Sequence, residues 1–148
     1  MFKSIKLAKS RSKSGSLVVV GVYKGDSNCP RSLKDLDENK EIDSVLKRPE
    51  FTGNVGELAN AGDNILVVGL GQREKSDLNI IRKASASVIR QLFKRKETLA
   101  TIEIHRVITS RTGSREAVGQ SIAEGMGLAN WRYSKFDGSA SNKKSAIG

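Results

Sequence analysis

The chain has 148 residues, of which 37% are hydrophobic and 28% are charged, and its formal net charge is +10 at pH 7. That length suits one domain with one core, and the composition excludes the disordered and fibrous classes. The longest apolar runs fall far short of the roughly 20 residues that span a bilayer, and the basic start lacks the apolar stretch of a signal peptide. We therefore expect a cytoplasmic protein with no membrane partner.

The cysteine content and the distribution of charge indicate the cellular compartment and the possible partners. Cys29 is the only cysteine, so no internal disulfide can form, and a reducing compartment fits best. No activating partner is visible near it, and we expect no catalytic role. Residues 1–13 and 82–96 are two basic segments without acids, which raises nucleic acid as a partner and leaves open whether they form one surface or two.

The first half of the chain predicts one buried strand and one helix. Leu17–Tyr23 is a continuous, β-branched run typical of a strand that is buried on both faces. The apolar spacing from Ser32 to Arg48 favours a helix that ends before Pro49. The glycine-rich stretch Phe51–Leu58 is expected to be a short strand or hairpin, and Asn60–Asn64 a turn.

The second half repeats the strand and helix alternation. Ile65–Gly71 predicts a second buried strand, and a helix begins near Asp77 with Ser76 as its N-cap. Thr98–Ile108 is rich in β-branched residues and is expected to be a third strand. The apolar positions of the helix after Asp77 recur at spacings of three and four and are expected to face inward: Ile81, Ala84, Val88 and Leu92.

The last predicted element is a helix from Arg115 to about Asn130, capped by Ser114. Residues Ser139–Gly148 are expected to be a linker or a frayed end. Strands that alternate with helices imply a three-layer α/β/α sandwich around a mixed, mostly parallel sheet with right-handed crossovers.

Few residues suggest a binding site. Gly69 and Gly71 follow a buried strand and precede a helix, where an α/β protein can hold a phosphate. The dinucleotide fingerprint fails, however, because Glu74 stands where a third glycine is required. We interpret the two glycines as a tight connection and keep them only as weak candidates for cofactor binding.

The remaining candidates favour structural roles. His105 is the only histidine and has no local cluster of metal ligands or catalytic partners, so we expect a packed or surface residue. Trp131, Tyr133 and Phe136 could stack on bases, but packing against the sheet or a neighbouring domain is favoured. A group of carboxylates is interspersed with lysines and is expected to form a solvated helix face: Asp35, Asp37, Glu38, Glu41 and Asp43. We therefore name no catalytic and no metal-binding residue.

Four segments, in this order, resemble the amino-terminal domain of the leucyl (cytosol) aminopeptidase family. They are LVVVGVYKG at Leu17–Gly25, FTGNVGE at Phe51–Glu57, ILVVGLG at Ile65–Gly71 and IAEGMGLANWRYSKFDGS at Ile122–Ser139. The helix expected after the third segment, IIRKASASVIRQL at Ile80–Leu92, is similar to the alanine- and arginine-rich helix of the family. The four segments are spread over nearly the whole chain, and their order is that of the family.

The resemblance implies a macro-domain-like fold over residues 1–138, with residues 139–148 as the start of a linker to a catalytic domain. In the family that second domain is a metallopeptidase with two divalent metals, zinc or manganese, which polarise the scissile carbonyl and activate a water. The family's Asn-Thr-Asp-Ala-Glu-Gly-Arg ligand motif is missing, since Ser121 and Ile122 stand where Thr and Asp would, so Glu124 is not read as a ligand. The simplest expectation is a truncated chain or single domain that is not an enzyme alone.

The resemblance also implies partners. Family members are generally homo-hexamers with central catalytic domains, so this domain is expected to aid assembly and shape access to the active sites of a protein that releases N-terminal amino acids from peptides. Two alternatives stay open: a macro-domain-like module that binds a nucleotide or ADP-ribose through the Gly69–Gly71 loop, and an accessory domain that binds DNA through the two basic segments.

Overall fold

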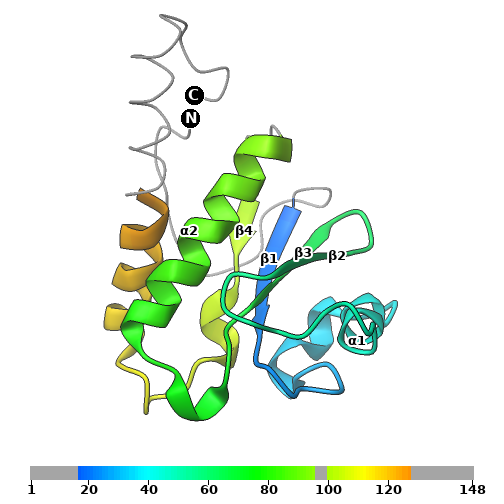
Figure 1. Cartoon of the computed structure of the whole chain (residues 1–148), viewed down its shortest axis with the longest axis horizontal. Coiled ribbons are helices and arrows are strands. Elements are labelled where there is room, and N and C mark those ends of the chain that lie inside the picture. The colour runs from blue at the N-terminus through cyan, green and yellow to red at the C-terminus, as the bar shows by residue number, and fades with distance from the viewer. Residues whose placement is uncertain (1–16, 96–99, 128–148) are drawn as a thin grey trace, which may run out of the picture.

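A computed structural model describes residues 17–95 and 100–127 (Figure 1). Expectations for residues 1–13, for Trp131, Tyr133 and Phe136, and for Ser139–Gly148 lie outside the described residues. The strands are β1 (Leu17–Val22), β2 (Leu58–Ala61), β3 (Ile65–Gly69) and β4 (Ala100–Ile102). The helices are α1 (Glu41–Leu46), α2 (Leu78–Arg95) and residues 115–127, with three short 3-10 helices, η1 (Arg31–Leu36), η2 (Arg73–Lys75) and η3 (Ile104–Val107).

The sheet has the order β2-β3-β1-β4, and it is mixed and mostly parallel. β1 pairs in parallel with β3 and with β4, in a register that sets Val18 beside Ile65 and Val19 beside Ile102, whereas β2 pairs with β3 antiparallel. All six residues of β1 are buried, so both faces of the sheet are covered. The two crossovers leave in opposite directions along the sheet, so right-handed connections place α1 and α2 on opposite faces. The predicted α/β sandwich is confirmed.

The helix α2 provides the largest share of one apolar layer. The four positions predicted to face inward are all buried: Ile81, Ala84, Val88 and Leu92. This confirms the helical spacing of apolar residues predicted from the sequence. Beside it lies the helix of residues 115–127 (Figure 1), where a Cβ at Gly125 would meet the backbone of Arg82. Among the described residues, no helix combines the length and apolar character that a bilayer crossing needs.

The helix predicted from Ser32 to Arg48 is wrong as a single element. The chain forms η1, turns through Lys40 in the left-handed region at φ 54°, and begins α1 at Glu41. The cause is Asp37, whose carboxylate accepts the amides of Ile42 at 2.7 Å and Asp43 at 3.3 Å. These bonds satisfy amides that the first turn of α1 leaves unpaired, so the side chain of Asp37 starts a new helix where the sequence pattern continues the old one.

The third predicted strand, Thr98–Ile108, is also too long. β4 ends at Ile102, and η3 begins at Ile104. Glu103 lies between them with ψ near 20°, outside the extended region, and its carboxylate is bound to Arg106. β-branched residues therefore continue past the point where the backbone leaves the sheet, and composition alone misses that point.

Two smaller boundaries differ as well. Asn60 and Ala61 belong to β2 instead of the predicted turn, and strand pairing in this region begins only at Leu58. The N-cap of α2 is Asp77, whose Oδ1 accepts the Ile80 amide at 2.8 Å, instead of Ser76. The predicted cap of the last helix is confirmed, because the Ser114 hydroxyl accepts the Ala117 amide at 3.1 Å.

Candidate functional site

The carboxyl ends of the three parallel strands β1, β3 and β4 lie at one end of the sheet, at the bottom of Figure 1. The loops that follow these strands, and the loop before the last helix, converge there. In open α/β sheets ligands generally bind in the crevice beyond the carboxyl ends of the strands. This end is therefore where the fold favours a binding site.

The weak candidates Gly69 and Gly71 lie at this end, but their amides are engaged within the protein. The Gly69 amide donates to the Glu57 carbonyl at 2.7 Å, and its carbonyl accepts the Gly56 amide at 3.0 Å. The Gly71 amide donates to the Gly53 carbonyl at 2.9 Å. A phosphate at these amides would have to displace those bonds. The two glycines hold one loop against another in this structure.

That second loop is the FTGNVGE segment, and its own carboxylate orders it. Glu57 accepts the Thr52 hydroxyl at 2.6 Å, the Thr52 amide at 2.9 Å and the Asn54 amide at 3.3 Å. The Thr52 hydroxyl, followed by the loop amides, holds the pKa of Glu57 below its usual value. Two of the four family-like segments therefore form one hydrogen-bonded unit, which gives their glycines a structural reason.

A small cavity of about 200 Å³ lies where β1 and β3 end. The Arg73 guanidinium lies 4.4 Å from the centre of the Tyr23 ring and 3.1 Å from an Asp26 oxygen. The Tyr23 hydroxyl is 3.0 Å from the Ser76 hydroxyl, which is 3.0 Å from the Thr112 hydroxyl. These polar groups already bind one another, and the space suits at most a very small ligand. The Ser76 hydroxyl is used here, which explains why it does not cap α2.

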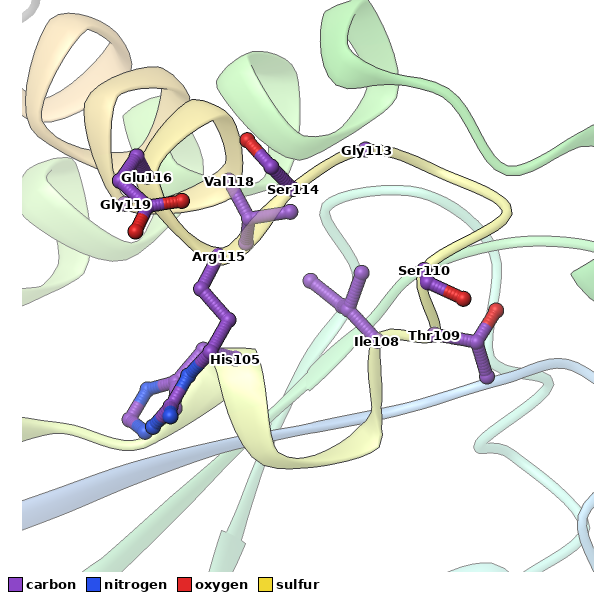
Figure 2. A pocket seen from close by; sticks show the side chains of 10 residues that line it. All are labelled: His105, Ile108, Thr109, Ser110, Gly113, Ser114, Arg115, Glu116, Val118 and Gly119. Carbon is purple, nitrogen blue, oxygen red and sulfur yellow. The ribbon is translucent and has the colours of Figure 1, made fainter.

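A larger cavity of about 630 Å³ lies between η3, the loop after it and the first two turns of the helix of residues 115–127. Figure 2 shows the side chains of Ile108 and Val118 directed toward one another across this space, with Arg115 extending toward the His105 ring. We refer to this space as the His105 cavity. Its size falls within the roughly 300–1,000 Å³ typical of small-molecule sites.

His105, predicted as a packed or surface residue, is half-buried at the edge of this cavity. Its Nε2 lies 3.7 Å from a Glu103 carboxylate oxygen, and its Nδ1 is buried with no partner among the described residues. Burial lowers the pKa of His105, and the charges of Arg106 and Arg115 lower it further, while Glu103 opposes them. Neutral pH therefore favours the uncharged ring, which carries one donor and one acceptor nitrogen.

Sequence reasoning did not single out the other groups of the His105 cavity. Arg115, Ile108 and Val118 belong to no motif, and they meet only because the chain folds back through the loop of residues 109–114. The available signal was the loop itself, a polar, glycine-containing connection at the carboxyl side of the sheet, where α/β proteins place functional residues.

A partly buried ion pair between Glu103 and Arg106 holds η3 in place. Glu103 is 3% exposed, and its Oε2 accepts the Arg106 Nε at 2.8 Å. The Arg106 guanidinium also donates to both oxygens of Asp35, at 2.8 and 2.9 Å, and to the Ser32 carbonyl at 3.3 Å. These bonds join η1 to η3 and fix the position of His105 between Glu103 and the cavity.

The carboxylates predicted as a solvated helix face serve the fold in part. Asp35 and Asp37 bind Arg106 and the start of α1, and Asp43 lies 2.8 Å from Lys47 and accepts the Cys29 amide at 3.1 Å. Lys47 is the main cause that lowers the pKa of Asp43. Over residues 17–95 and 100–127 no group of three or more His, Cys, Asp or Glu side chains could hold a metal ion. The described residues do not fit a two-metal centre.

Cys29 is expected to be an unreactive thiol. It is 6% exposed, and burial together with the nearby Asp37 carboxylate raises its pKa to about 12. Because the thiolate is the reacting form, we expect modification of the native chain by a disulfide reagent at pH 8 to be about a hundredfold slower than modification of the urea-unfolded chain. Absorbance at 412 nm follows the reaction, and Cys29 is the only cysteine. Equal rates in the two states would contradict the buried environment.

Comparison with known proteins identifies the family. The sequence profile described as the cytosol aminopeptidase family, N-terminal domain, matches residues 19–139. The chain belongs to the cytosol aminopeptidase family. The resemblance of its four segments to that domain is confirmed, and the match covers most of the chain.

Individual relatives agree with the family assignment. A probable cytosol aminopeptidase of Aquifex aeolicus is 30% identical over 139 residues, which is 90% of this chain and 27% of that protein. One of Clostridium tetani is 28% identical over 129 residues, which is 84% of this chain and 25% of that protein. The chain therefore spans about a quarter of the length of these curated relatives.

Proposed function

We propose that this chain is the non-catalytic amino-terminal domain of a two-metal aminopeptidase that releases N-terminal amino acids from peptides. The observation that carries the proposal is the match of residues 19–139 to the N-terminal domain of the cytosol aminopeptidase family. The relatives are about four times as long as their matched portion, which leaves room for a catalytic domain in the same polypeptide. That catalytic domain would contain the metal ligands and would bind the two metal ions, zinc or manganese.

The proposed role of the domain is to aid assembly of a homo-hexamer and to shape access to the active sites. The boundaries would be residues 1–138 for the domain and 139–148 for the start of the linker. The setting would be the cytoplasm. Support for a structural role comes from Asp37 and Asp35, whose carboxylates bind the Ile42 amide and the Arg106 guanidinium within the domain.

Hydrolysis of leucine p-nitroanilide with added manganese or zinc tests the catalytic part of this proposal. We expect no activity from the 148-residue chain and activity from the protein made from the full reading frame of the gene. Removal of residues 1–138 from that full protein tests assembly, with molar mass measured by light scattering. Activity of the short chain would overturn the non-catalytic assignment, and an unchanged number of subunits and an unchanged rate after the removal would overturn the assembly role.

One observation favours a second candidate, the binding of DNA. Lys83, Arg90 and Lys94 are exposed on α2, at spacings of seven and four residues that place them on one face. No carboxylate of the described residues forms an ion pair with these three cations. Binding through phosphates weakens steeply with salt, so duplex DNA should show a salt-dependent fluorescence anisotropy change. This candidate is abandoned if DNA gives no such change.

A further inference from the structure

One wall of the His105 cavity is apolar, and no side chain of the described residues occupies the space in front of it. The two side chains of Ile108 and Val118 face one another across the space (Figure 2), and the half-buried Ile108 supplies more accessible apolar surface than Val118, which is 3% exposed. Gly113 and Gly119 also line the cavity and contribute no side chain. Burial of an apolar group against such a wall contributes roughly 25 cal/mol for each Å² removed from water. An aliphatic group of a few carbons therefore fits this part of the cavity.

Two opposite charges line the same cavity at adjacent positions. Arg115 and Glu116 are both exposed, and among the described residues neither forms an ion pair. A guanidinium is suited to bind a carboxylate, and a carboxylate is suited to bind an ammonium group. A ligand with only one of these charges would meet one favourable and one unfavourable neighbour. A zwitterion matches both.

The third feature is the imidazole of His105. Its Nδ1 is buried without a partner among the described residues, beside the side chain of Arg115 (Figure 2). Because the protein covers this nitrogen, a ligand in the cavity does not bind it, and the ring serves as a neighbour whose resonance reports on the cavity.

From the cavity, its apolar wall and its paired charges, we propose that the His105 cavity binds a free α-amino acid with an aliphatic side chain. The carboxylate binds Arg115, the ammonium group lies on the side of Glu116, and the side chain packs on Ile108 and Val118. The class of ligand follows from the cavity alone. Its biological sense rests on the proposed function, since a peptidase releases such molecules and a site on the accessory domain would sense the product.

The test uses His105 as a reporter, because it is the only histidine of the chain. We expect L-leucine to shift the Cε1 proton resonance of His105 in a saturable manner at constant pH, with a dissociation constant on the order of 1 mM, as suits a small and partly open site. Leucinamide, which lacks the carboxylate, and N-acetylleucine, which lacks the ammonium group, should each bind about tenfold more weakly, as should the Arg115→Gln variant.

Arg31→Gln is the matched control, since it also removes one exposed arginine but lies on η1 outside the cavity. It should bind leucine like the unmodified chain. The proposal is overturned if leucine causes no saturable shift, if inorganic phosphate or leucinamide binds as well as leucine, or if Arg115→Gln has no effect. Peptide hydrolysis does not enter this measurement, so its result leaves the proposed peptidase function untouched, and an inactive parent protein would leave the binding result untouched.

Discussion

Gly69→Ala should lower the free energy of unfolding by about 3 kcal/mol, which is a large part of the stability of a domain of this size. A Cβ at this position would overlap the carbonyl oxygen of Asn54 and approach Gly53 to within 2.6–2.7 Å. The atoms that the Cβ would meet belong to the backbone. Hydrogen bonds between residues 53–57 and 69–71 prevent the two loops from moving apart. Urea unfolding followed by circular dichroism measures the effect.

Gly127→Ala is the control for this substitution. Gly127 lies in the helix of residues 115–127, and a Cβ there would meet no described atom within 4 Å apart from its chain neighbours and the backbone of its own helix. Alanine is the better helix former, so this variant should gain up to about 1 kcal/mol. If Gly69→Ala instead unfolds at the same urea concentration as the unmodified chain, packing does not require a glycine at this position. Nucleotide binding by the Gly69–Gly71 loop would then be the better explanation for this glycine.

The parts of the fold that the sequence predicts well are those determined locally. β1 and β3 are continuous β-branched runs, and the inward face of α2 repeats every three or four residues, so each element carries its own signal. Ser114 caps its helix because its hydroxyl has no competing partner elsewhere in the described structure. Such signals need no knowledge of the rest of the chain.

Several of the errors involve bonds between distant residues, whereas the break in the predicted Ser32–Arg48 helix follows from a local bond of Asp37 to the Ile42 amide. Ser76 looks like an N-cap, but its hydroxyl lies 3.0 Å from the hydroxyls of Tyr23 and Thr112, which are 53 and 36 residues away. The predicted strand Thr98–Ile108 ends early, at Ile102, and the η3 that replaces its second half is bound through Arg106 to Asp35, 71 residues away. The His105 cavity was missed for the same reason, since Ile108 and Val118 meet only after the chain has folded.

The substitution Glu103→Gln is expected to destabilise the domain by about 2 kcal/mol. The carboxylate is 4% exposed, and Arg106, its partner at 2.8 Å, is 26% exposed. Glutamine keeps the size of the side chain but removes the charge, so a largely buried guanidinium loses the partner that compensates its desolvation. Asp35 remains bound to the same guanidinium, which limits the loss. The free energy of unfolding in urea at pH 7 measures the effect.

Asp35→Asn is the matched control, because it removes the other carboxylate from the same guanidinium. Asp35 is 62% exposed, so water and salt screen its interaction, and we expect a loss below about 1 kcal/mol that shrinks further as salt is added. The cost of Glu103→Gln should depend less on salt, since its pair is shielded from ions. Equal costs and equal salt dependence for the two variants would show that burial does not govern this network, and that Glu103 does not fix η3 and the edge of the His105 cavity.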